Sequence, residues 1–405
     1  MKRIYLDYAS TTPLDARVRD AMAPFFGKFF GNSSSLHAEG VVAKKALDSA
    51  RTSVARSFEA HADEIVFTSG GTEANNLAIF GVLGNVAYSY DRSYTPRKST
   101  PHVVTTNIEH ASVLETLRRL EQQGAIEVTY VSVEPNGIVR PEKIISAIRP
   151  NTVLVSVMYA NNEIGTVQPI RKIGQLIRGL RLQKPKAKSY KLKAVENRRP
   201  VFHSDACQAP LYLRCLVNAL EVDLLSIDAH KIYGPKGVGA LYVRRETPLA
   251  PLLLGGGQER GLRSTTENIP AIVGLAEALL IAISEREKES VRIAKLRDDL
   301  CIALLQSGKT EIVVNGSMRN GERLPNNINV SLPGVDTEFL TLKLDAEGVS
   351  VSTKSSCLKD EKQSYVLSAL GGDVARSSSG LRLTLGRWTT KAEIRSVANI
   401  LKKLL

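Results

Sequence analysis

The sequence predicts an α/β protein that has a large domain with a mostly parallel sheet and a smaller α+β domain. Its 405 residues exceed the roughly 250–300 residues at which a single hydrophobic core stops growing. From Leu14 onward, segments with helical periodicity alternate with short apolar runs, which is typical of βαβ units. Beyond Gly257 this alternation gives way to one long helical stretch and then to mixed strands and helices, which favours a second domain.

The elements of the large domain follow from periodicity and from turn residues. Short apolar runs predict strands, amphipathic runs predict helices, and Pro, Asn and Gly mark the turns between them. The predicted helices are 14–26, 38–57, one that begins at Thr72, 112–123 and a short one that begins at Pro141. The predicted strands are 64–68, 103–106, 127–133, 152–159, 201–204, 224–227 and 238–243, the last being an antiparallel return.

The smaller domain is predicted from the remaining periodic segments. They are a helical stretch at 271–305, strands at 311–314, 327–332 and 381–385, and helices at 337–346 and 391–405. We therefore expect a large domain over residues 15–270 and a small domain made of residues 1–14 and 271–405. Residues 85–101 and a basic insertion at about 183–199 lack periodicity, and long segments of this kind are functional or disordered.

The composition excludes several classes of protein. The longest apolar stretch, 269–283, is interrupted by Pro270, Gly274 and Glu277, so it predicts a core helix and not a membrane span. The N-terminal residues contain neither the apolar stretch nor the cleavage site of a signal peptide, which predicts a cytoplasmic protein with no membrane partner. The four cysteines show no CxxC spacing, so neither a metal site nor a disulfide framework is predicted.

The net charge of +13 is concentrated in one segment of the chain. Residues 181–200 contain eight Lys or Arg and one Glu, which accounts for +7 of the total. This segment lacks the aromatic residues that alternate with basic ones in proteins that bind single-stranded nucleic acid. We interpret it as a solvated surface loop, with direct nucleic-acid binding as the alternative.

Lys231 is the first candidate for chemistry, in the stretch DLLSIDAHKIYGPKGVG at residues 223–239. It follows the buried strand 224–227, and ligands of α/β proteins bind beyond the carboxyl ends of the strands. A lysine held among apolar walls can lose its proton and attack a carbonyl group. Pyridoxal 5′-phosphate (PLP) offers such a carbonyl. The alternative is a surface lysine in a polar loop.

Paired glycines between a strand and a helix form a candidate phosphate site. Gly70 and Gly71 precede Thr72, where the predicted helix begins. Glycines let the backbone approach a ligand, and a helix N-terminus presents free N–H groups to an anion. The alternative is an ordinary turn in which Thr72 caps the helix.

Four further polar residues follow other strands of the predicted sheet. Asp205 ends the strand at 201–204, and a carboxylate that faces a pyridine nitrogen keeps the nitrogen protonated. Gln208 follows within reach of the same crevice. Asn161 and His110 come just after other strands, where Asn161 suits the ring hydroxyl of PLP and His110 suits the face of the ring. His110 is equally compatible with a polar loop.

Motifs spread over nearly the whole chain resemble those of the cysteine desulfurases, fold-type-I PLP-dependent enzymes of the class V aminotransferase family. In order, the motifs are LDYASTTP, FTSGGTEANN, IEH, MYANNEIGTVQPI, HSDACQ, AHKIYGPKGVGALYVRR, GGGQERGLRSTTEN and LRLTLGR. Each motif is weak by itself, whereas the combination is specific. The resemblance implies that the large domain contains a mostly parallel seven-stranded sheet between helices.

The resemblance also implies roles for individual residues. Lys231 would carry PLP, and His110 would stack on its ring and help to move protons. The cofactor-binding residues would be Gly71, Thr72, His110, Asn161, Asp205, Gln208, His230 and Lys231, together with Thr266 from the second subunit of a homodimer. Arg382 would bind the carboxylate of the substrate L-cysteine through its two-pronged guanidinium, with Asn32 nearby.

Cys357 is the candidate nucleophile. It lies in a polar stretch close to Lys354 and Lys359, and neighbouring cations favour the thiolate. In the family such a cysteine takes the sulfur of L-cysteine as a persulfide, and L-alanine is released. An acceptor protein of iron–sulfur cluster assembly or tRNA thiolation would then receive the sulfur. The alternative is an ordinary loop thiol.

Two positions depart from the family pattern. Asp228 stands where a serine usually contacts the phosphate, and a carboxylate beside a phosphate is repulsive. We therefore expect Asp228 to turn away, to be protonated, or to weaken cofactor binding. Lys354 and the loss of a glycine before Cys357 are expected to affect the rate more than the reaction type.

Two other functions remain open at the level of sequence. The same fold and cofactor serve a selenocysteine lyase or an aminotransferase-type enzyme, for which Cys357 is dispensable. A degenerate protein that has lost the cofactor, and that binds RNA or acts as a scaffold through the basic insertion, is the other alternative.

Overall fold

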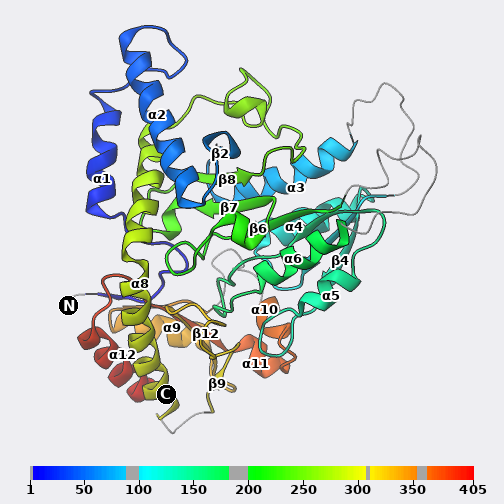
Figure 1. Cartoon of the computed structure of the whole chain (residues 1–405). Helices are drawn as coiled ribbons and strands as arrows, with labels where there is room; N and C mark the ends of the chain where they lie inside the picture. Colours follow the sequence, from blue (N-terminus) through cyan, green and yellow to red (C-terminus); the bar gives the residue numbers. More distant parts are fainter. Residues whose placement is uncertain (1–2, 88–99, 182–198, 307–310, 354–362) are drawn as a thin grey trace.

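The structure is a computed structural model that describes residues 3–87, 100–181, 199–306, 311–353 and 363–405. Cys357 and residues 183–198 of the basic insertion lie outside the described residues. The chain forms a large unit around one sheet and a smaller unit at one end of it (Figure 1). The long helix α8 (Ile269–Leu305) runs through both units.

Seven strands form the sheet of the large unit, in the spatial order β2-β8-β7-β6-β5-β3-β4. Their bounds are β2 Ile65–Thr68, β3 His102–Thr106, β4 Glu127–Val131, β5 Thr152–Ser156, β6 Val201–Asp205, β7 Leu224–Asp228 and β8 Gly239–Val243. Among these described strands, β8 alone runs in the direction opposite to the other six. The predicted mostly parallel seven-stranded sheet, with an antiparallel return after the lysine loop, is therefore confirmed.

Helices cover both faces of this sheet. The helices α3 (Gly71–Ala87) and α4 (Ala111–Gln122) pack on one face. The other face is covered by α1 (Ala16–Met22), α2 (Ala38–Ser57), α5 (Pro141–Ser146), α6 (Ile170–Arg181) and the first half of α8. Successive strand residues enter opposite layers, so that Leu224 packs with α3 and α4 whereas Leu225 packs on the other side. Burial on both faces explains why these strands read as continuous apolar runs.

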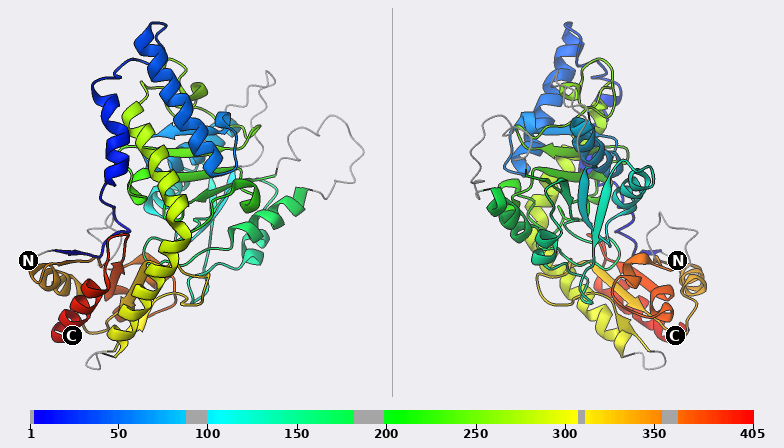
Figure 2. Two further views of the ribbon diagram at one scale, coloured as in Figure 1. Left: turned by 60° about the vertical axis from the view of Figure 1, so that its left-hand side comes forward. Right: turned by 90° about the vertical axis from the view of Figure 1, so that its right-hand side faces the viewer.

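The smaller unit combines short strands with helices. Its antiparallel sheet has the order β12-β10-β9, formed by β9 (Val313–Val314), β10 (Asn327–Ser331) and β12 (Gly380–Thr384). The N-terminal strand β1 (Ile4–Tyr5) pairs with β11 (Val349–Ser350) in this unit. The remaining helices are α9 (Thr337–Ala346), α10 (Tyr365–Ser368), α11 (Val374–Ser378) and α12 (Lys391–Leu404). The C-terminus and β1 thus both lie at the small-unit end of the molecule (Figure 2).

Helix α8 contributes to both hydrophobic cores. Its buried residues from Ala271 to Ile281 pack with the sheet of the large unit. Those from Ile293 to Leu304 pack with β10, β12 and α12 of the small unit. The predicted division at residue 270 therefore falls at the beginning of a helix that the two cores share.

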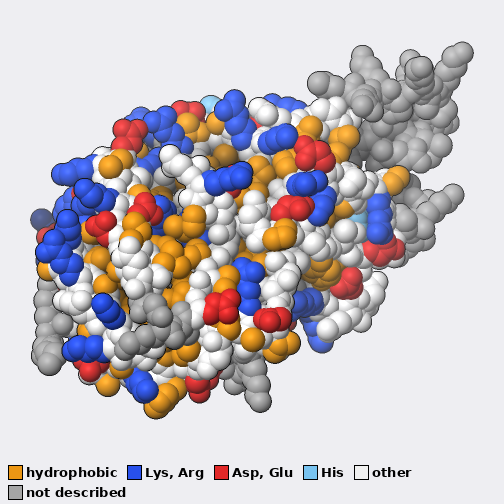
Figure 3. All heavy atoms as spheres, turned by 90° about the horizontal axis from the view of Figure 1, so that it is seen from below, with side chains coloured by type: hydrophobic (Ala, Val, Ile, Leu, Met, Phe, Trp, Pro, Cys, Tyr) orange, Lys and Arg blue, Asp and Glu red, His pale blue; other side chains and the backbone are white. Residues whose placement is uncertain are grey.

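Two features of the described residues bear on a membrane or nucleic-acid partner: the hydropathy of their helices and the charges on one face of the molecule. None of their helices combines the length and the apolar character that a membrane span requires. In the view onto the small-unit end of the molecule, basic and acidic side chains are interspersed with apolar ones (Figure 3). This face therefore presents no surface of a single charge sign.

Candidate active site

A cavity of about 180 Å³ lies at the carboxyl ends of β6 and β7, beside the N-termini of α3 and α4. Eight of the predicted catalytic and binding residues line it, together with Asp228. They are Gly71, Thr72, His110, Asp205, Gln208, His230, Lys231 and Arg382. The fold thus brings together, at one edge of the sheet, residues that are up to 311 positions apart in the sequence.

Lys231 is held at the wall of this cavity and not on an open surface. It ends a short 3₁₀ turn (Ala229–Lys231) that directly follows β7. Its Nζ donates hydrogen bonds to the carbonyl oxygens of Ala9 and Ser10, at 2.8 and 2.7 Å. The N-terminal segment therefore keeps the amine in the cavity, which argues against the reading of Lys231 as a surface lysine.

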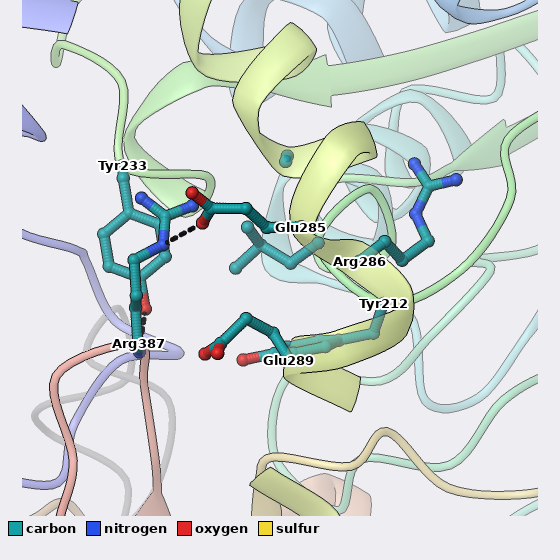
Figure 4. Close-up of a pocket in the computed structure, with 8 residues that line it drawn as sticks. Tyr212, Tyr233, Glu285, Arg286, Glu289 and Arg387 are labelled. Atoms are coloured by element: carbon teal, nitrogen blue, oxygen red, sulfur yellow. Dashed lines mark hydrogen bonds and ion pairs between the residues drawn. The ribbon is translucent and has the colours of Figure 1, made fainter. Parts of the chain in front are cut away.

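Tyr233 anchors the loop that carries the lysine. It has a φ of 65°, which is rare for a bulky residue and has to be held by its surroundings. The Tyr233 hydroxyl accepts a hydrogen bond of 2.6 Å from the backbone N–H of Arg387. The guanidinium of Arg387 lies 4.3 Å from the centre of the Tyr233 ring and 2.8 Å from Glu285 of α8 (Figure 4). Side chains from both units therefore fix the position of the lysine loop.

Asp205 lies at the end of β6 and is 6% exposed. Its Oδ2 accepts a hydrogen bond of 2.8 Å from the amide of Asn75, and its Oδ1 accepts one of 2.9 Å from the backbone N–H of Cys207. Two donors therefore hold the carboxylate in one orientation at the cavity wall.

A chain of hydrogen bonds connects Asp205 with His110. The Asn75 amide nitrogen also donates to Ser112 Oγ at 2.9 Å, and Ser112 Oγ lies 2.8 Å from His110 Nδ1. The backbone N–H of Ser112 donates to the same Nδ1 at 3.2 Å. Since this N–H group can only donate, Nδ1 is an acceptor, and the neutral His110 ring carries its proton on Nε2.

The N-terminus of α3 is already occupied by a carboxylate. The backbone N–H of Gly71 donates to Asp228 Oδ2 at 2.6 Å, and a Cβ at Gly71 would lie 2.5 Å from the sulfur of Cys207. Burial alone would raise the pKa of Asp228, but hydrogen bonding to His230, the charges of His230 and Lys231, and the Gly71 N–H lower it below its ordinary value. Asp228 therefore neither turns away from the cavity nor is protonated, which contradicts two of the three expectations for it. The third expectation, weaker cofactor binding, stays a prediction.

Arg382 of β12 enters the cavity from the small unit. It is 1% exposed, and its guanidinium donates to Asp7 (2.8 Å), to Ser10 Oγ (2.7 Å) and to the carbonyl of Asn162 (3.0 Å). Its buried Nε has no hydrogen-bond partner in the described part of the chain. The guanidinium is therefore pre-oriented, and its Nε–H is available to a further acceptor.

Three of the predicted site residues do not line the cavity. Asn161 is fully buried, and its Oδ1 accepts hydrogen bonds from the backbone N–H groups of Glu163 and Ile164, at 2.8 and 2.9 Å. It thus stabilises a turn, and Asn162 lines the cavity instead. Asn32 and Thr266 are exposed and lie outside the cavity of their own chain.

Sequence reasoning did not single out Asn75, Ser112 or Asn162, all of which line the cavity. A signal existed for Asn75, because it lies one helical turn after Gly71 and thus on the same face of α3. A signal also existed for Ser112. His110 is the N-cap of α4, and the residue two positions after an N-cap is placed to form a hydrogen bond with the N-cap side chain. Nothing local distinguishes Asn162 from its neighbour Asn161.

The three described cysteines are free thiols. Burial, followed by the charges of Asp205 and Asp228, raises the pKa of Cys207 well above its ordinary value. Burial raises the pKa of Cys215 to about 12 and also raises that of Cys301. None of these three is therefore a thiolate at neutral pH. The described residues also contain no group of three or more His, Cys, Asp or Glu side chains placed to hold a metal ion.

Glu109 is fully buried and precedes His110 in the sequence. Its Oε1 accepts hydrogen bonds from Thr106 (2.5 Å) and from the backbone N–H of Met158 (3.0 Å), whereas Oε2 has no partner among the described residues. Burial, with the charge of Asp205, raises the pKa of Glu109 to about 8, although the two hydrogen bonds lower it. Glu109 is therefore protonated at neutral pH.

We expect this raised pKa to make the protein less stable as the pH rises. Between about pH 4.5 and 8 the folded chain binds a proton at Glu109 that the unfolded chain has lost. The free energy of unfolding should then fall by about 1.4 kcal/mol per pH unit in this window. Glu109→Gln removes this contribution. Urea unfolding of both proteins from pH 5 to pH 8 should show the wild type losing stability relative to the variant, and a constant difference would contradict the assignment.

Comparison with known proteins agrees with this geometry. A family model described as aminotransferase class-V matches residues 4–182 and 190–397. The cysteine desulfurase IscS of Dictyoglomus turgidum is 41% identical over 407 residues, covering 100% of this chain and 95% of that protein. The cysteine desulfurase IscS of a Neisseria meningitidis strain is 42% identical, covering 98% of this chain and 91% of that protein.

Solved structures agree as well. A NifS-like protein superposes with a TM-score of 0.86 and 34% identity, over 99% of both chains. The structure of SspA in complex with cysteine has a TM-score of 0.76 and 31% identity, over 96% of this chain and 100% of the other. The chain therefore belongs to the aminotransferase class-V family, among the cysteine desulfurases.

Proposed function

We propose that the protein is a PLP-dependent cysteine desulfurase, which converts L-cysteine to L-alanine and transfers the sulfur to Cys357 as a persulfide. The cavity carries the proposal, because a lysine, a buried carboxylate and the N-terminus of a long helix meet there. An amine, a carboxylate and an anion site are the groups that suit the aldehyde, the pyridine nitrogen and the phosphate of PLP. The named relatives favour L-cysteine as the substrate.

The groups that line the cavity fit this cofactor along its length, with the exception of Asp228. The residues that would hold it are Lys231, Asp205, Gln208, His110, Gly71, Thr72 and His230. When bound, PLP supplies a carbonyl group for the amine of the substrate and a ring that takes up electrons. Because Asn75 and Ser112 hold His110 with its proton on Nε2, that nitrogen presents a proton for donation within the cavity.

Arg382 is the group that would bind the carboxylate of L-cysteine. Because its partners already fix this buried guanidinium, it loses little conformational entropy when it binds a carboxylate. Asp7 already forms an ion pair with Nη2 of the Arg382 guanidinium. The substrate carboxylate and Asp7 would therefore both interact with Arg382.

The segment that carries Cys357 is anchored at both of its described ends beside the cavity. On one side Ser352 exchanges backbone hydrogen bonds with Arg382, at 2.6 and 3.2 Å. On the other side the Tyr365 hydroxyl donates a hydrogen bond of 2.5 Å to the carbonyl of Glu109. Cys357 lies five residues after Ser352, a chain length of at most about 18 Å. These anchors support the proposal that Cys357 takes up the sulfur at the cavity and passes it to an acceptor protein for iron–sulfur cluster assembly or tRNA thiolation.

A homodimer accounts for Asn32 and Thr266, the two exposed predicted residues that do not line the cavity of their own chain. Ser33 Oγ donates a hydrogen bond of 2.8 Å to Glu267, so the segments with Asn32 and Thr266 adjoin each other. Leu36, in the loop of Asn32, is 97% exposed. Exposed apolar side chains beside functional residues favour an interface, and we propose that Thr266 completes the cavity of the partner subunit.

One assay tests the reaction. The protein is incubated with PLP and either L-cysteine or L-selenocysteine, and L-alanine is measured by amino-acid analysis. We expect L-alanine from L-cysteine. Formation of L-alanine from L-selenocysteine alone would identify a selenocysteine lyase instead.

Ser112→Ala is expected to lower kcat/KM for L-cysteine about fivefold, because His110 loses one neutral hydrogen bond to Nδ1. In Ser112→Ala, the ¹⁵N chemical shifts of the His110 ring should show a smaller population of the Nε2–H tautomer than in the wild type. Ser112→Thr retains the hydroxyl and should restore both values. Loss of activity in Ser112→Ala with unchanged ring shifts would indicate a merely structural role for Ser112.

A further inference from the structure

Asp228 lies at the end of the cavity that Gly71, Thr72 and His230 also line. Its Oδ2 accepts the 2.6 Å hydrogen bond from Gly71, its Oδ1 accepts one of 3.3 Å from the backbone N–H of His230, and His230 Nε2 lies 3.5 Å from Oδ2. The side chain is 11% exposed. The carboxylate is therefore an integral part of the cavity wall.

These contacts use the same groups that the proposed function assigns to a phosphate. Gly71 is the first residue of α3, a helix of 17 residues, and the N-terminus of a helix attracts an anion through its free N–H groups and its dipole. Asp228 supplies such an anion from within the chain. A Cβ at Gly70 or Gly71 would lie only 3.1 or 3.2 Å from Oδ2, so the carboxylate also fills the space directly above the two glycines.

We propose that Asp228 is a resident anion that competes with the phosphate of PLP for the N-terminus of α3. The inference rests on the proposed function, since it concerns the cofactor of that reaction. The carboxylate stabilises the empty site by satisfying the Gly71 N–H. It also lowers the affinity for PLP, because the phosphate has to displace a like charge from its donors or bind beside it.

Equilibrium dialysis of four proteins tests the competition. They are the wild type, Asp228→Asn, Asp228→Ser and the control Asp63→Asn, which removes the same charge from an exposed ion pair with Arg245 outside the cavity. We expect both Asp228 variants to bind PLP at least about tenfold more tightly than the wild type. Pyridoxal, which lacks the phosphate, should bind equally to all four proteins, and Asp63→Asn should match the wild type.

Thermal unfolding without PLP gives a second reading of the same competition. The two Asp228 variants should unfold at a lower temperature than the wild type in a phosphate-free buffer, because the N-terminus of α3 has lost its anion. Inorganic phosphate should raise their unfolding temperature more than that of the wild type.

Two results would overturn the inference. The first is that the wild type binds PLP as tightly as both Asp228 variants. The second is that pyridoxal gains as much affinity as PLP, because the effect then does not arise at the phosphate. In either case PLP still binds to the protein, so the proposed function is not contradicted. If none of the proteins binds PLP or pyridoxal, the proposed function fails, and the inference fails with it.

Discussion

Replacing Lys231 with alanine is expected to abolish both the retention of PLP and the turnover of L-cysteine. Lys231 is the one lysine among the described residues that lines the cavity, and its amine is held there by the carbonyls of Ala9 and Ser10. Loss of the residue that forms a covalent link lowers rates by about three orders of magnitude or more. Visible absorbance after exhaustive dialysis reports the retained cofactor, and amino-acid analysis of L-alanine reports the turnover.

Lys236→Ala is the matched control for this variant. Lys236 lies in the same loop, carries the same charge and is exposed outside the cavity. Its removal should leave cofactor content and turnover at the level of the wild type. Retention of coloured, active protein by Lys231→Ala would show that another amine binds the cofactor.

Cys357→Ala is expected to lower the desulfuration of L-cysteine by about three orders of magnitude, while L-cysteine still binds. In the proposed reaction the sulfur leaves the substrate only when the Cys357 thiolate accepts it, and loss of a nucleophile acts on this scale. The three described cysteines have raised pKa values, so none of them can replace it at neutral pH. Sulfide release in the presence of a reductant measures turnover, and the change in the cofactor spectrum measures binding.

Cys301→Ala serves as the control, because Cys301 is 4% exposed in the core of the small unit. It should desulfurate L-cysteine at the rate of the wild type. If Cys357→Ala were as active as this control, the persulfide step would be excluded, and lyase or aminotransferase-type chemistry would be favoured.

The arrangement of the large unit was predictable from the sequence because its elements carry strong local signals. All seven strands and the helix α2 appear within two or three residues of the predicted bounds. Helix α6 was not predicted, although Ile170, Ile173 and Ile177 recur at helical spacing and are buried, because it leads directly into the basic insertion. The pairing of β1 with β11 was not predictable either, since strands of two residues arise from contacts between distant parts of the chain.

The site was predictable to the extent that it depends on strand ends. Lys231 and Asp205 each follow an apolar run, and parallel strands bring such residues to one edge of a sheet. The hydrogen bonds of Asn75 and Ser112 were not predictable, because an amide and a hydroxyl on two helices carry no joint signature. The choice between Asn161 and Asn162 depends on the geometry of one turn. The sequence predicted that Asp228 would repel a phosphate. Its hydrogen bond with the backbone of Gly71 could be seen only in the structure.

Mass spectrometry of the PLP-loaded protein after one equivalent of sulfur-labelled L-cysteine, without reductant, tests the central claim most directly. We expect one labelled sulfur atom on the peptide that contains Cys357, and an equal amount of L-alanine in solution. An unmodified Cys357 peptide with L-alanine already formed, or label on Cys207 in its place, would contradict the mechanism.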